Sequence, residues 1–129
     1  MKLETEGGLS LADPPWHRVE TALRQLDVGF GNSCASLSLD PSNYVQTLRG
    51  INGFHLEWRI TDNKLDRLPH HLASDPGRAG EPENLLKLGG KDDGQPCDML
   101  SRDQVIEAFR CFFDRMAPSR TLNRRGVEF

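Results

Sequence analysis

The amino-acid sequence predicts an α+β fold: a mostly antiparallel β-meander of about three to five strands with two amphipathic helices packed on one face. Three observations lead to this prediction. Residues 54–60 (FHLEWRI) alternate between apolar and polar side chains, which is typical of a strand with one buried face. The dipeptide Asn52-Gly53 just before them is a strong hairpin signal. Residues 14–26 and 101–116 instead carry apolar side chains at helical spacing.

Length and composition favour a single domain over residues 1–129, with 36% hydrophobic and 27% charged residues. The formal net charge of −3 gives no global field toward nucleic acid or an anionic membrane. The N-terminal residues are acidic and lack an apolar stretch, so we expect neither a signal peptide nor a membrane anchor, and a cytoplasmic location. Three irregular segments are expected: a loose N-terminal arm at 1–12, a long Gly/Pro/Asp-rich loop at 74–98, and a C-terminal tail at 119–129. Within the arm, Leu9 and Leu11 are a candidate edge strand.

The first helix is expected to run to about Leu26. Asp13 is a favourable N-cap because its carboxylate accepts hydrogen bonds from the free N–H groups of the first turn, and prolines are tolerated there. The apolar residues form one stripe that we expect to face the core: Trp16, Val19, Leu23 and Leu26.

The second helix is expected from Ser101 to Met116. Ser101 and Gln104 fit a capping box, and Leu100 and Val105 fit a hydrophobic staple. Its broad apolar face is expected to pack on the sheet: Val105, Ile106, Phe109, Phe112, Phe113 and Met116.

The strands of the meander are expected at residues 33–39, 44–48 and 54–60. Their buried face should carry Leu37, Leu56 and Trp58, against which both helices pack. A fourth, shorter strand at residues 68–73 is expected at a sheet edge, because Pro69 has no N–H to donate.

Catalytic and cofactor motifs are not recognisable in the sequence. Cys34, Cys97 and Cys111 are widely spaced and form no CxxC pair, and the histidines are not spaced as metal ligands. There is no glycine-rich phosphate loop and no nucleophile elbow. We therefore expect no enzyme activity, no metal and no cofactor. An enzyme that uses His55, Glu57 and His70 is the alternative.

Nucleic acid is also not an expected partner. A C-terminal arginine cluster could contact phosphates, but the acidic net charge argues against it. The cluster consists of Arg120, Arg124 and Arg125.

Two polar surfaces are candidates for binding a protein partner. The first is the polar face of residues 54–60, with His55, Glu57 and Arg59. The second is the acidic part of the long loop, which would complement a cationic cleft in a partner. Its carboxylates are Glu81, Glu83, Asp92 and Asp93. The simpler alternative is a solvated sheet face and a solvated loop.

The order of the motifs WHRVETALRQL, YVQTLRGINGFHLEWR and LSRDQVIEAFRCFF resembles small bacterial immunity proteins of the polymorphic-toxin, contact-dependent secretion type. The resemblance covers residues 16–60 and 99–116, and the sequence departs from it in segment 74–98 and in the tail. It implies a cytoplasmic, non-catalytic inhibitor, used in bacterial competition such as type VI secretion. Such a protein binds a cognate toxin encoded next door, without a membrane or nucleic acid, and occludes its active site. A small adaptor or chaperone of a secretion or phage-defence locus is a further alternative.

Overall fold

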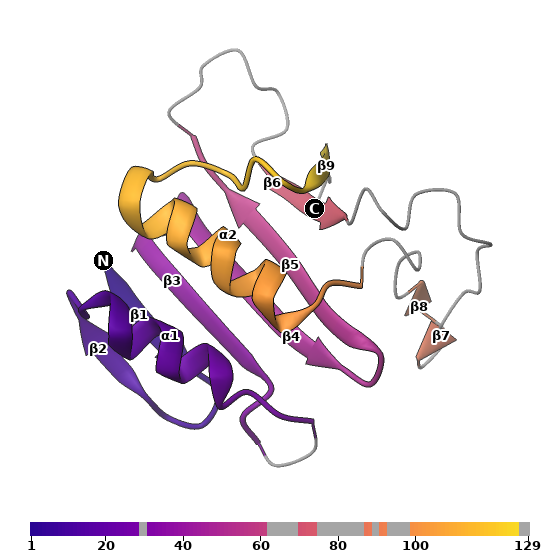
Figure 1. The fold of residues 1–129 in the computed structure, drawn as a ribbon, viewed down its shortest axis with the longest axis horizontal. Coiled ribbons are helices and arrows are strands. Elements are labelled where there is room, and N and C mark those ends of the chain that lie inside the picture. The colour runs from indigo at the N-terminus through magenta and orange to yellow at the C-terminus, as the bar shows by residue number, and fades with distance from the viewer. Residues whose placement is uncertain (29–30, 62–69, 75–86, 89–90, 93–98, 127–129) are drawn as a thin grey trace.

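A computed structural model describes residues 1–28, 31–61, 70–74, 87–88, 91–92 and 99–126. The fold is α+β, as predicted, with two helices on one face of an antiparallel sheet (Figure 1). The sheet has seven strands in the order β2-β1-β3-β4-β5-β6-β9, more than the predicted three to five. The additional strands come from both terminal segments of the chain.

The helices are α1 (Trp16–Arg24) and α2 (Arg102–Arg115). The strands of the large sheet are β1 (Lys2–Thr5), β2 (Ser10–Ala12), β3 (Cys34–Asp40), β4 (Asn43–Gly50), β5 (Gly53–Arg59), β6 (His70–Ser74) and β9 (Asn123–Gly126). A separate hairpin pairs β7 (Lys87–Leu88) with β8 (Lys91–Asp92). The long loop predicted at 74–98 does not include Ser74, which ends β6, and residues 75–86, 89–90 and 93–98 lie outside the described residues.

The central meander β3-β4-β5 confirms the three predicted strands. Gly50 pairs with Gly53, so the connection is a tight hairpin whose turn residues are Ile51 and Asn52. This register places the alternating apolar residues of all three strands on the helix-covered face. The buried residues on that face are Ala35, Leu37, Val45, Thr47, Leu56 and Trp58.

The N-terminal segment is part of the sheet, so the prediction of a loose arm at 1–12 is wrong. β1 lies between β2 and β3, with Leu3 opposite both Leu11 and Leu37. Leu3 is completely buried because strands flank it on either side and the core lies beneath it. The candidate edge strand at Leu9 and Leu11 corresponds to β2, at one edge of the sheet.

The predicted fourth strand forms at β6, but it is not an edge strand. β6 begins at His70, after Pro69, so every residue of the strand can donate to a neighbour. β9 pairs along its outer side, with Ala73 opposite Arg124. The C-terminal segment therefore docks on the sheet. Before β9, Ser119 and Leu122 are buried.

The helix ends agree only in part with the predictions. Ser101 and Gln104 form the predicted capping box of α2, in which the Ser101 hydroxyl accepts from the Gln104 amide at 3.2 Å. Asp13 does not cap α1, because the helix begins three residues later, at Trp16, and its N-cap position is Pro15, without a side-chain hydrogen bond. Leu100 forms a backbone bridge to Phe54 at the start of α2, with N···O distances of 2.8 and 2.9 Å.

The core lies between the sheet and the two helices. Phe54, Phe109 and Phe112 are the largest of its fully buried side chains. The predicted apolar stripe of α1 is buried at Val19, Leu23 and Leu26, whereas Trp16 is only partly buried. Trp16 lies at the start of the helix, and its indole ring packs on the Phe113 ring with a centroid distance of 5.6 Å.

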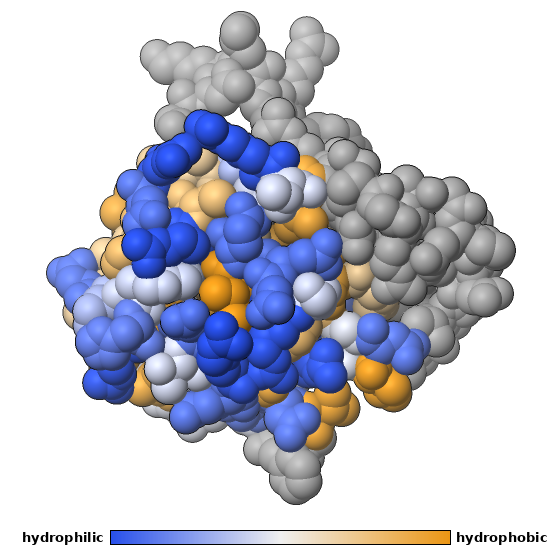
Figure 2. Space-filling view, in the orientation of Figure 1, coloured by the Kyte–Doolittle hydropathy of each residue, from blue (hydrophilic) through white to orange (hydrophobic). Residues whose placement is uncertain are grey.

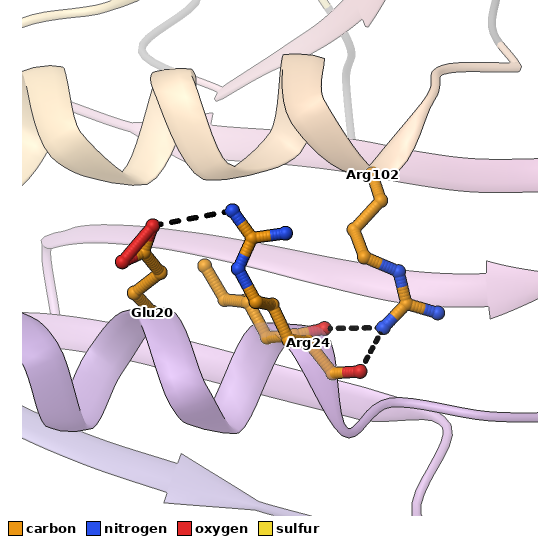
Figure 3. A network of polar contacts seen from close by, with 4 residues as sticks. Glu20, Arg24 and Arg102 are labelled. Atoms are coloured by element: carbon orange, nitrogen blue, oxygen red, sulfur yellow. Dashed lines mark hydrogen bonds and ion pairs between the residues drawn. The ribbon is translucent and has the colours of Figure 1, made fainter.

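Arg102 joins the two helices (Figure 3). Its guanidinium donates to the carbonyl oxygens of Leu23 at 3.1 Å and Leu26 at 3.0 Å, and also to that of Arg24. These carbonyls lie at the C-terminal end of α1, where helix geometry leaves acceptors unpaired. The same guanidinium lies 5.2 Å from the Phe54 ring centroid. Arg102 therefore both caps α1 and covers the core.

Candidate functional site

The sheet face opposite the helices is the candidate site, and we call it the open face. Both helices lie on the other side, and no described helix or strand covers this one (Figure 1). Polar side chains dominate it because period-2 alternation points every second residue away from the core. Its central residues are Cys34, Ser36 and Ser38 of β3, Tyr44, Gln46 and Leu48 of β4, and His55, Glu57 and Arg59 of β5.

The strand register arranges these side chains in rows across the sheet. Residues directly opposite one another in an antiparallel pair share a face, with Cβ atoms about 4.5–5.5 Å apart. One row runs Ser38, Tyr44, Arg59, a second runs Ser36, Gln46, Glu57, and a third runs Cys34, Leu48, His55.

The first two rows continue onto β1, which contributes two further charged side chains to the open face. Lys2 is opposite Ser38, and Glu4 is opposite Ser36. Lys2 and Glu4 form an ion pair with an N···O distance of 3.8 Å.

Three of the predicted binding residues therefore lie together: His55, Glu57 and Arg59 share the open face at the centre of the sheet. Nothing comparable can be said of the second predicted surface. Glu81, Glu83 and Asp93 lie outside the described residues, and Asp92 is described only by its backbone in β8. The acidic surface remains a prediction.

Glu57 is the most perturbed carboxylate of the open face. Burial raises its pKa above the ordinary value, since desolvation disfavours the charged form. Among the described residues, no ion pair joins the Glu57 side chain to that of Arg59, two residues further along the strand.

Arg59 is also incompletely satisfied. Its Nε atom is buried and has no hydrogen-bond partner among the residues that the structure describes. Tyr44 lies opposite it on β4. The pKa of Tyr44 is raised, first by burial and then by the negative charge of Glu57, while the positive charge of Arg59 lowers it. The phenol is thus neutral at physiological pH.

The thiols near the described polar clusters are poor nucleophiles. Burial and the nearby Glu6 raise the pKa of Cys34, and burial together with Glu107 raises that of Cys111. A raised pKa keeps a thiol protonated, whereas nucleophilic attack requires the thiolate. Within the described part of the chain, no three or more His, Cys, Asp or Glu side chains gather as metal ligands.

The helix side of the molecule differs from the open face. Figure 2 shows this side as a largely hydrophilic surface with smaller apolar areas. Two ion pairs on this side are formed within single helices, Arg24 with Glu20 at 3.3 Å and Arg110 with Asp114 at 2.8 Å, each four residues apart.

Tyr44, Gln46, Ser36 and Ser38 belong to the candidate site, although sequence reasoning named only residues of β5. Part of the signal for them was present: their alternation put them on the polar side of neighbouring strands, and Asn52-Gly53 located the hairpin between β4 and β5, although the observed turn residues are Ile51 and Asn52.

Comparisons of the chain with protein-family models, with curated proteins and with solved structures find no match. No helix in the described ranges has both the length and the apolar character needed to cross a membrane.

Proposed function

We propose that this chain is an immunity protein, which binds a cognate secreted bacterial toxin in the cytoplasm and neutralises it by occluding its active site with the open face. One observation carries the proposal. Glu57 and Arg59 of β5 are partly buried and unpaired with each other, on a sheet face that no described element covers.

The composition of the open face suits a protein interface. Arginine and tyrosine are enriched among residues that dominate binding energy, and Arg59 and Tyr44 are adjacent here. Both come from strands in the interior of a seven-stranded sheet. Such strands hold side chains more rigidly than loops do, so less conformational freedom is lost on binding.

The resemblance of residues 16–60 and 99–116 to immunity proteins points to the same class. In that class the inhibitor needs no chemistry of its own. A face built for contact, with protonated thiols nearby, agrees with that role.

The test is co-expression with the product of the neighbouring gene. An immunity protein co-purifies with it one-to-one and rescues cells from its toxicity. We expect Arg59→Ala and Glu57→Gln to weaken binding and rescue. The matched variants Arg18→Ala and Glu20→Gln, on α1, should leave both unchanged.

Two outcomes would contradict the proposal. The first is the absence of binding to any neighbouring gene product. The second is binding to a secretion component with toxicity unaltered, which is the behaviour of an adaptor.

A further inference from the structure

Glu57 and Arg59 on the open face have the same strand spacing as Lys2 and Glu4, which form an ion pair on the same face. Lys2 and Glu4 on β1, like Arg59 and Glu57 on β5, are two residues apart and point to the same side. Lys2 and Glu4 approach to 3.8 Å, whereas no ion pair forms between Arg59 and Glu57. A spacing of two residues along a strand therefore permits an ion pair, but Glu57 and Arg59 do not form one with each other.

The charges follow the rows of the sheet. One row runs from Lys2 through Ser38 and Tyr44 to Arg59 and continues to His70 of β6. The adjacent row runs from Glu4 through Ser36 and Gln46 to Glu57 and continues to Leu72 of β6 and Arg125 of β9. Between β1 and β5, the described open face thus carries basic ends on one row beside acidic ends on the next, separated by roughly 7 Å, or two residues of an extended strand.

We propose that the open face recognises a protein partner with the complementary arrangement: a carboxylate that meets Arg59 and a lysine or arginine that meets Glu57, spaced as these two are. This inference rests on the proposed function and specifies the surface of the toxin that would be bound.

The energetics favour such a partner. Arg59 and Glu57 have already lost part of their hydration in the free protein, since the Arg59 Nε is buried and the Glu57 carboxyl is desolvated. A charge that is already partly desolvated gains more from an opposite charge than a fully hydrated one. A partner lacking the two charges would bury both without compensation, which selects against wrong partners.

An exchange of the two residues tests the arrangement directly. The double variant Glu57→Arg/Arg59→Glu keeps composition and net charge but reverses the order of the rows at the centre. We expect the Kd for the co-purified toxin to rise by roughly 30-fold or more, because two like-charged contacts replace two favourable ones. The matched exchange Glu20→Arg/Arg24→Glu, at an exposed pair on α1 and away from the open face, should change it by less than about 3-fold.

A second measurement needs no partner. We expect sodium acetate to shift the Arg59 Nε–H signal in ¹⁵N NMR spectra at lower concentration than that of the exposed Arg18. A Kd unchanged by the exchange at the centre, in a variant shown to be folded by circular dichroism, overturns the inference and leaves the immunity function standing. An Arg59 response no greater than that of Arg18 also overturns it. A shift of the Arg59 signal at lower acetate concentration than that of Arg18, together with no toxin binding, would support the charged arrangement and contradict the proposed immunity function.

Discussion

Gly53 follows the hairpin turn and begins β5. The next residue, Phe54, pairs with Leu100, two residues before α2. The Gly53 φ of +148° is a backbone conformation that residues other than glycine rarely adopt. A Cβ built there would lie 2.9 Å from the Leu100 carbonyl oxygen, which cannot move freely because Leu100 pairs with Phe54. The hairpin signal in the sequence therefore also reflects a close approach between distant segments.

Gly53→Ala should lower the free energy of unfolding by about 1–3 kcal/mol, through backbone strain and the clash with Leu100. Gly8→Ala is the matched control, since Gly8 also has a positive φ of +97° but has no atom within 4 Å of the added Cβ. Urea unfolding of both variants separates the two effects. Equal losses would show that the contact with Leu100 is unimportant.

Glu57 should make stability depend on pH. Burial raises its pKa, so between the ordinary and the raised value the folded state binds more protons than the unfolded state. Its contribution therefore decreases as the pH rises through this window. Glu57→Gln cannot ionise, so its stability relative to the original protein should increase from pH 4 toward neutrality.

Urea unfolding across this pH range measures the effect, with Glu20→Gln as the control because Glu20 is ion-paired on the helix side. A difference between Glu57→Gln and the original protein that stays constant with pH would contradict the desolvation of Glu57.

At the scale of the element, the ends of the two helices are stabilised differently. α2 has its own capping box, whereas α1 lacks a side-chain N-cap and receives its C-terminal hydrogen bonds from Arg102 of the other helix. The stability of α1 therefore depends on α2.

Arg102→Ala should cost about 2 kcal/mol, because it removes charged hydrogen bonds to carbonyl groups at the end of α1. Arg24→Ala, which removes only an exposed pair with Glu20 in the same region, should cost about 0.5 kcal/mol. Thermal unfolding monitored by circular dichroism compares the two. Equal costs would mean that Arg102 does not join the helices.

The long amphipathic elements could be predicted because their periodicity is local. The alternation over residues 54–60 and the capping box at Ser101 each specify one element without reference to the rest of the chain. The terminal strands could not be predicted in this way. β1 and β9 are each four residues long, and they form by pairing with β3 and β6, at positions far away in the sequence.

The candidate site was likewise predictable only where it depends on local sequence. Alternation places Glu57 and Arg59 on one face, but their desolvation depends on neighbours from other strands. Whether the two side chains pair with each other is a tertiary property that the sequence pattern does not contain.

For the whole molecule, the incorporation of β1 between β2 and β3 makes the N-terminal segment part of the core. Leu3→Ala should lower the free energy of unfolding by about 2–5 kcal/mol, since it leaves a cavity at a fully buried position. Leu39→Ala, at a residue that is 50% exposed, should change it by less than about 0.5 kcal/mol. Chemical denaturation measures both, and a small loss at Leu3 would show that β1 is dispensable.

The backbone bridge between Phe54 and Leu100 has an evolutionary consequence. It anchors the chain where it enters α2, and the pairing of β6 with β5 and β9 anchors it at Ser74. The chain between these two anchors can change length and composition at little thermodynamic cost, since each doubling of a loop adds only about 0.6 kcal/mol of closure entropy. We therefore expect insertions and deletions between the two anchors to cost the rest of the fold little stability.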